Sequence, residues 1–233
     1  NAENRFTGWV DVDLSPAGEE ESRRAGELIA KEPGLDFDVV HTSVLTRAVR
    51  TANLVLEELD RTWLPVRRHW RLNERHYGAL QGLDKKQTAE RHGLEQVKAW
   101  RRSYRVRPPE LARDDPSHPL NDPRYRLVPP LALPSSECLA DVVARMTPCY
   151  DDVIGPDLLS GRDVLVVAHG NSLRALIKQL ELISDDAIVG LDVPTGFPRV
   201  YELDDSLSVR SARYLGDPEA ARAAAAAVAR QAG

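Results

Sequence analysis

A histidine follows a predicted buried strand in the stretch 163-DVLVVAHGNSLRALIK-178. Residues 164–167 form a short apolar run, which is typical of a parallel strand that is covered on both faces. After Gly170 the apolar residues recur at helical spacing, so His169 is predicted between the carboxyl end of a strand and a helix N-terminus. Ligands of open α/β sheets bind at such ends, where the helix offers free N–H groups to an anion. A buried structural histidine is the alternative that this stretch leaves open.

Two further stretches carry groups that could hold or transfer an anion. In 41-HTSVLTRAVRTA-52, Arg47 falls near a predicted helix N-terminus, where the helix dipole does not stabilise a cation. An anion partner would explain an arginine there, and a surface arginine is the alternative. The stretch 71-RLNERHYGALQG-82 gathers Glu74 and other titratable groups on a segment that fits neither a helix nor a strand, as binding and catalytic segments often do.

Paired arginines and a Thr-Gly step complete the set. In 100-WRRSY-104, Arg101 and Arg102 offer forked donors that match phosphate or carboxylate, with an ordinary surface pair as the alternative. In 5-RFTGW-9, the Thr7 hydroxyl and the Gly8 N–H could hold a phosphate oxygen. An arginine-rich set with a histidine, one candidate proton carrier and no metal-ligand spacing favours phosphoryl transfer without a metal. No P-loop, kinase signature or Gly-x-Ser-x-Gly elbow occurs.

The elements that must position these groups alternate between strand and helix. Short strands are predicted at 37–41, 64–70, 164–167, 198–203 and 207–213. Helices are predicted after Ser15, after Ser43, over 83–104 with a break near Gly93, and from Glu137 to about Val153 with a kink at Pro148. This order predicts a single α/β domain over 1–233 with a mostly parallel central sheet and helices on both faces. Residues 105–135 lack periodicity and are expected to form a covering insertion, and the alanine-rich 217–233 a mobile tail.

Composition narrows the class of protein. With 42% hydrophobic and 29% charged residues among 233, the chain suits a soluble globular protein. The net charge of −5 argues against nucleic-acid binding, and the absence of a long apolar run argues against a membrane protein and favours the cytoplasm. The two cysteines, Cys138 and Cys149, are expected to be free thiols.

These stretches resemble the cofactor-dependent phosphoglycerate mutases of the histidine phosphatase superfamily. The residues that carry the resemblance are ENRFTGWVDVDLS, TSVLTRAVRTA, LNERHYGALQGLDK, WRRSY and AHGNSLRALIK, from Asn1 to about Leu215. The resemblance implies a phosphoglycerate-mutase-like fold and the glycolytic and gluconeogenic interconversion of 3-phosphoglycerate and 2-phosphoglycerate. It further implies a phosphohistidine intermediate, 2,3-bisphosphoglycerate as the primer, no metal, a small phosphorylated substrate as the binding partner, and a homodimer or homotetramer.

The same resemblance implies roles for individual residues. Glu74 would carry the proton to and from the substrate hydroxyl, and His169 would stabilise the transferring phosphoryl group. The residues implied to bind substrate are Asn1, Thr7, Gly8, Arg47, Arg75, His76, Tyr77, Lys85, Arg101, Arg102, Gly170 and Asn171.

One departure concerns the nucleophile. In the family it is a histidine in a Leu-x-Arg-His-Gly-Glu-Ser motif, at the end of the first strand and just before the Asn-x-Glu-Asn-Arg-Phe-Thr-Gly stretch. None of the six histidines, which are His41, His69, His76, His92, His118 and His169, lies in such a motif. We therefore expect the natural protein to carry a further strand and loop, about 15–20 residues, before Asn1, since neighbouring strands would otherwise keep unpaired backbone groups.

Two alternatives stay open at this stage. A phosphatase of the same superfamily would pass the phosphoryl group to water, although a covering insertion favours the mutase because it can exclude water. If the nucleophile segment is absent from the mature protein, the chain would be a non-catalytic anion-binding protein.

Overall fold

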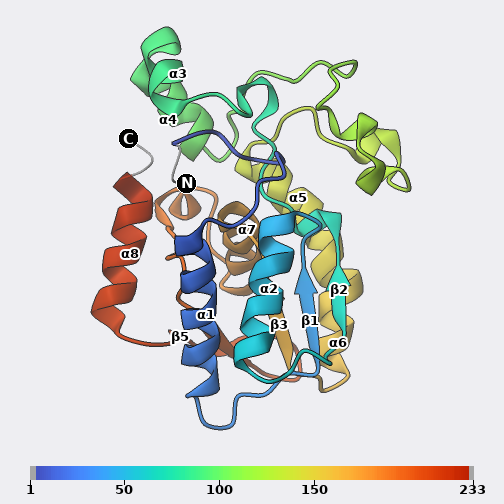
Figure 1. Ribbon diagram of the computed structural model, residues 1–233, viewed down its shortest axis with the longest axis vertical. Helices are drawn as coiled ribbons and strands as arrows, with labels where there is room; N and C mark the ends of the chain where they lie inside the picture. Colours follow the sequence, from blue (N-terminus) through green and yellow to red (C-terminus); the bar gives the residue numbers. More distant parts are fainter. Residues whose placement is uncertain (1–3, 231–233) are drawn as a thin grey trace.

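The computed structural model describes residues 4–230, which alternate between strands and helices (Figure 1). The helices are α1 (Pro16–Ala30), α2 (Thr46–Glu58), α3 (Lys85–His92), α4 (Leu94–Arg102), α5 (Leu139–Cys149), α6 (Gly155–Leu159), α7 (Gly170–Leu180) and α8 (Pro218–Arg230). The strands are β1 (Val39–Thr42), β2 (Val66–Arg68), β3 (Val164–Val167), β4 (Arg199–Leu203) and β5 (Val209–Tyr214).

Three parallel strands form the main sheet, in the order β2–β1–β3. Val40 of β1 lies opposite Val66 of β2, and Thr42 of β1 lies opposite Val167 of β3. Strands β4 and β5 pair antiparallel in a separate two-stranded sheet. The predicted α/β class with a parallel sheet is confirmed, and the last two predicted strands form the antiparallel pair.

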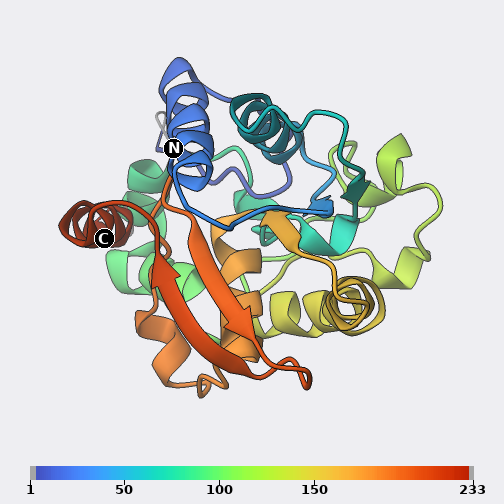
Figure 2. The same cartoon turned by 90° about the horizontal axis from the view of Figure 1, so that it is seen from below.

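Helices cover both faces of the main sheet, as Figure 2 shows. On one face, Ala52 and Leu56 of α2 pack with Val40 and Val167. On the other face, α5 and α7 form the largest core cluster, against which Val164 and Val166 pack. Alternate residues of β3 therefore face opposite layers, which explains why its sequence is an unbroken apolar run.

The predicted helix boundaries have local causes. Ser15 caps α1 by accepting a hydrogen bond from the Gly18 N–H at 3.2 Å, and Pro16 occupies the first turn. Gly93 separates α3 from α4 with φ +85°, a conformation that strongly favours glycine. Helix α5 continues through Pro148 to Cys149, and a π-helical turn, Tyr150–Ile154, joins it to α6, so a kink at Pro148 stays a prediction.

Residues 105–135 contain only short 3₁₀ turns, at Pro119–Asn121, Pro123–Tyr125 and Pro130–Ala132. The segment is nevertheless packed, because Tyr125 and Leu133 are buried against Trp9 near the start of the chain. The alanine-rich tail forms α8, whose Ala221 is buried. That residues 105–135 cover the site and that the tail is mobile stay predictions. Within residues 4–230, no helix is long and apolar enough to cross a bilayer.

Candidate active site

The carboxyl ends of β1 and β3 lie side by side and bring two side chains together. Ser43 follows β1 and His169 follows β3, and the Ser43 Oγ lies 2.8 Å from the His169 Nε2. The Ser172 hydroxyl accepts a hydrogen bond from the His169 N–H at 3.1 Å, which fixes the start of α7. His169 is therefore held from both sides at the strand end where the sequence places it.

The His169 ring is neutral in this surrounding. Burial holds the pKa of His169 well below its ordinary value, and the positive charges of Arg47 and Arg145 lower that pKa further. An anion placed between His169 and Arg47 would raise the pKa of His169, since a negative charge stabilises the protonated ring. Anion binding and protonation of His169 would thus support each other.

Glu74 lies beside the N-terminus of α7. Its Oε1 accepts hydrogen bonds from the Asn171 Nδ2 at 2.8 Å and from the Arg75 N–H at 2.6 Å. A Cβ placed on Gly170 would be 3.9 Å from the Glu74 Oε2, so the carboxylate faces this glycine. Among residues 4–230, no donor is hydrogen-bonded to Oε2, which leaves that oxygen available to carry a proton.

Arg47 is joined to the Thr7–Trp9 turn rather than to a carboxylate. Its Nη2 donates to the Gly8 carbonyl at 2.7 Å and its Nη1 to the Val10 carbonyl at 3.1 Å. Gly8 has φ +51°, and a Cβ there would lie 2.3 Å from the Gln81 Oε1, so only glycine fits this turn. Burial lowers the pKa of Arg47, although Glu74 and Asp11 oppose that effect. Within the described part of the chain, no carboxylate forms an ion pair with this guanidinium, so an anionic ligand would satisfy it.

Several cations, among them the Arg75 that follows Glu74, lie near one another and form what we call the cation cluster. Its members are Arg75, Lys85, Arg101, Arg102 and Arg174.

Burial and repulsion by neighbouring cations lower the pKa of three members of this cluster, namely Lys85, Arg101 and Arg174. Burial, with a contribution from Arg101, lowers the pKa of Lys85 to about 8. Burial also lowers the pKa of Arg174 to about 10, with contributions from Arg75 and Arg102. Because bringing an anion among these groups would relieve the repulsion, the cluster has the electrostatics of a phosphate or carboxylate site.

Arg75 is the most enclosed member of the cluster, at 1% exposure. Its Nη2 donates to the Tyr77 hydroxyl at 3.0 Å and to the Arg101 carbonyl at 2.7 Å, and its guanidinium stacks on the Tyr77 ring. Its Nε and Nη1 have no hydrogen-bond partner among the residues that the structure describes. Two unsatisfied charged donors in a buried position point to a ligand.

The structure brings most of the predicted residues to one place, with two exceptions. Asn1 lies outside the described residues. His76 is fully buried, accepts a hydrogen bond from the Gly78 N–H through Nδ1 at 3.0 Å, and packs edge-on against Trp9. Its contact with substrate stays a prediction.

Sequence reasoning missed four residues that support the site, namely Ser43, Arg174, Glu137 and Arg145. Arg174 donates to the Asn171 Oδ1 at 3.2 Å, which orients the amide so that its nitrogen faces Glu74. Ser43 could have been found, because it follows one strand end as His169 follows the next. Glu137 and Arg145 were visible only as parts of the helix predicted from Glu137 to about Val153.

The buried His76 makes a prediction about stability. Burial lowers the pKa of His76 to about 3, and the charges of His118 and Arg145 add to this. The unfolded chain has an ordinary histidine pKa of about 6.5, so between pH 6.5 and 3 the unfolded state binds one more proton. The contribution of His76 to the free energy of unfolding is therefore fully present above pH 6.5. It is lost as the pH is lowered toward 3, by about 1.4 kcal/mol per pH unit. His76→Asn, which keeps an acceptor near the Gly78 N–H, should flatten this slope by about that amount.

Urea unfolding at a series of pH values between 6 and 4 measures this slope. His92 is exposed on α3, so His92→Gln should leave the slope as in the wild type. An equal slope in wild type and His76→Asn would show that His76 is not held neutral by burial.

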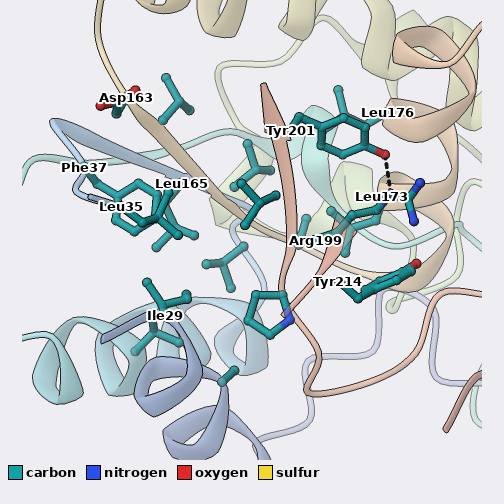
Figure 3. Close-up of a pocket in the computed structure, with 18 of the residues that line it drawn as sticks. Ile29, Leu35, Phe37, Asp163, Leu165, Leu173, Leu176, Arg199, Tyr201 and Tyr214 are labelled. Carbon is teal, nitrogen blue, oxygen red and sulfur yellow. Dashed lines mark hydrogen bonds between the residues drawn. The ribbon is translucent and has the colours of Figure 1, made fainter. Parts of the chain in front are cut away.

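A groove of about 990 Å³ runs between β3 and β4 (Figure 3). Leu165 of β3 and Tyr201 of β4 line its opposite walls, Ile29 of α1 lines it from one layer, and Leu176 of α7 from the other. Within residues 4–230, β3 pairs only with β1 and β4 only with β5, so both strands turn unpaired edges to the groove. Such edges bind another strand readily.

Comparisons with known proteins bear on this site. Residues 1–206 match the histidine phosphatase superfamily (branch 1). A 2,3-bisphosphoglycerate-dependent phosphoglycerate mutase of Nitratidesulfovibrio vulgaris (strain DP4) is 63% identical over 231 residues, which are 99% of this chain and 92% of that protein. The protein of the same name from Thermobifida fusca (strain YX) is 60% identical over 233 residues, 99% of this chain and 94% of that protein.

Solved structures share the fold at lower identity. A mycobacterial glucosyl-3-phosphoglycerate phosphatase is 25% identical with a TM-score of 0.64, covering 91% of this chain and 90% of its own. The alpha-ribazole phosphatase from Shigella flexneri is 20% identical with a TM-score of 0.66, covering 93% of this chain and 90% of its own. Sequence similarity is thus far greater to the mutases than to these phosphatases.

Proposed function

Because the chain belongs to the histidine phosphatase superfamily, branch 1, we propose that it is an enzyme that interconverts 3-phosphoglycerate and 2-phosphoglycerate and depends on 2,3-bisphosphoglycerate. The observation that carries this proposal is the identity of 60% and 63% to two mutases over 99% of the chain. The glycolytic and gluconeogenic role follows from that reaction. We place the enzyme in the cytoplasm and expect a homodimer or homotetramer.

The geometry supports separate roles for the two sides of the site. On one side, Arg47 and His169 hold the oxygens of the transferring phosphoryl group and neutralise its charge. On the other side, the cation cluster, with Tyr77, holds the substrate carboxylate and its remaining phosphate. The N-terminus of α7, with Gly170 and Asn171, donates to the oxygens that lie between the two sides.

Glu74 lies between these two sides and carries the proton. It takes the proton from the substrate hydroxyl as that oxygen receives the phosphoryl group. It then returns a proton to the oxygen that has lost its phosphoryl group. Asn171 and the Arg75 N–H hold Oε1 and leave Oε2 for this transfer.

The donor set fits 2,3-bisphosphoglycerate, which carries two phosphates and a carboxylate. Arg47 would bind one phosphate, and the cation cluster would bind the second phosphate and the carboxylate. When bound, this cofactor supplies the phosphoryl group that primes a histidine. Metal-free transfer remains part of the proposal, since the cations of the site can neutralise the charge themselves.

We further propose that the phosphorylated histidine follows a strand that fills the groove between β3 and β4 and precedes Asn1 in the natural protein. A strand there, parallel to β3, would pair with both unpaired edges and end beside His169. Asn4, the first described residue, lies next to Lys85, since its carbonyl accepts a hydrogen bond from the Lys85 N–H. The first described residues run along the same end of the sheet to which β1 points (Figure 1).

The site of phosphorylation tests this assignment. The natural full-length protein is incubated with 2,3-bisphosphoglycerate, quenched in alkali, which preserves phosphohistidine, and digested for mass spectrometry. We expect the phosphate on a histidine in a peptide that precedes Asn1. A phosphate on His169, or on any other of the six histidines of residues 1–233, would contradict the assignment.

A further inference from the structure

A buried ion pair lies behind the segment that carries Glu74. Arg145 of α5 donates through Nε to the Glu137 Oε1 at 2.6 Å and through Nη2 to the Glu137 Oε2 at 3.0 Å. The two side chains are 5% and 4% exposed, so both charges are removed from water. Burying such a pair is costly, and apolar residues of similar volume are often equally stabilising in its place.

The remaining donors of Arg145 converge on the backbone of that segment. Its Nη1 donates to the Arg71 carbonyl at 2.6 Å, and its Nη2 lies 3.2 Å from both the Asn73 and the Glu74 carbonyls. The Glu74 carbonyl also accepts a hydrogen bond from the Trp9 Nε1 at 2.5 Å. One guanidinium therefore holds the backbone on both sides of the catalytic carboxylate.

Glu137 fixes the following residue in the same way. Its Oε2 accepts a hydrogen bond from the His76 N–H at 2.9 Å, and its own N–H donates to the His76 carbonyl at 2.8 Å. Leu72 ends a 3₁₀ turn and Gly78 begins the next, so residues 73–77 belong to no regular helix or strand. These residues lack the backbone ladder that would otherwise hold them, and side chains take its place.

We propose that Arg145 and Glu137 are positioning residues, which hold the backbone of residues 73–76 so that Glu74 and Arg75 meet the substrate in register. The inference rests on the proposed function, because it gives the segment its catalytic role. Only an arginine offers a planar fork that can reach a carboxylate and several carbonyls at once. A lysine at position 145 keeps the positive charge and one hydrogen bond, but it cannot bond to Glu137 and to several carbonyls at once.

Arg145→Lys in the natural full-length enzyme is the test. Displacing a catalytic group by about an ångström can cost about a hundredfold, so we expect kcat to fall tenfold to a hundredfold. KM for 3-phosphoglycerate should change less than kcat, by up to about tenfold, since Arg75 moves with the segment while Arg101, Arg102 and Lys85 are untouched. In hydrogen exchange followed by mass spectrometry, peptides that span residues 71–77 should exchange at least about tenfold faster.

A matched control separates positioning from loss of stability. Ile154→Ala removes a buried side chain from the same core cluster that α5 joins, and none of residues 73–77 belongs to that cluster. It should lower stability by about 2–5 kcal/mol and leave kcat and exchange in residues 71–77 as in the wild type, at a temperature where both variants are folded.

Arg145→Lys would overturn the inference if it lowered stability but left both kcat and exchange in residues 71–77 at wild-type values. Exchange does not depend on turnover. An inactive wild type would therefore contradict the proposed function, while the exchange comparison would still decide whether Arg145 holds this segment.

Discussion

Glu74→Gln should lower kcat for the conversion of 3-phosphoglycerate by about a thousandfold, within the range that general acid–base catalysis contributes. The amide keeps an oxygen that can accept from the Asn171 Nδ2 and the Arg75 N–H, so the side chain should stay in place. It cannot take a proton from the substrate hydroxyl. KM should therefore change by less than about threefold, because substrate binding depends mainly on the cation cluster and Arg47.

Steady-state kinetics of the purified variant check this expectation. Thermal unfolding should give the wild-type midpoint within a few degrees, which excludes a folding defect. A variant that keeps more than about a tenth of the wild-type kcat would show that another group carries the proton.

Arg47→Met should lower kcat by about a hundredfold to a thousandfold, the usual loss when one preorganised donor to a developing charge is removed. Arg47 is half-buried near His169 and Glu74 and bonds only to backbone carbonyls of residues 8 and 10 among the described residues. Methionine fills the same space without a charge, so the loss reports on the transferring phosphoryl group. The rate of phosphoenzyme formation in a single turnover should fall by the same factor, because each transfer passes this position.

Arg50 provides the matched control on the same helix. It lies one turn further along α2 and forms surface ion pairs with Asp13 and Glu19, and such pairs contribute at most about 1 kcal/mol. Arg50→Met should keep kcat within about twofold of the wild type. Equal losses in the two variants would show that the helix, and not the guanidinium of Arg47, sets the rate.

The strand ends of the site could be predicted because their sequence signals are local. The apolar run before His169 marks β3, and the change to helical spacing marks α7. Glu74 was found by its place among titratable residues on an irregular segment, and resemblance to a known family gave it a role. Strand-end geometry was sufficient to place His169, whereas Glu74 needed the resemblance for its role, which stays a prediction.

The support behind the site could not be predicted in this way. Glu137 and Arg145 are eight residues apart in sequence, and only the fold brings Arg145 to the carbonyls of residues 71–74 and Glu137 to the backbone of His76. Ser43 meets His169 because β1 lies next to β3, and lateral strand order is not encoded in periodicity. The groove between β3 and β4 could not be predicted for the same reason, because it depends on which strands lie next to each other.

Residues 105–135, predicted to form a covering insertion, lack sequence periodicity for a physical reason. Their 3₁₀ turns each begin with a proline and are too short to give a repeat of apolar residues. His118 and Asp122 cap two of these turns through side-chain acceptors. Their burial against Trp9 comes from single residues such as Tyr125, which no period of two or 3.6 reveals.

Phosphorus NMR of the natural full-length protein with 3-phosphoglycerate and a trace of 2,3-bisphosphoglycerate tests the proposed function most directly. We expect a growing 2-phosphoglycerate signal that depends on the bisphosphate, with little inorganic phosphate, because in the proposed mechanism the phosphoryl group passes between a histidine and the two substrate oxygens and not to water. Inorganic phosphate as the only product would identify a phosphatase, and an unchanged spectrum would identify an anion-binding protein; either result would contradict a mutase.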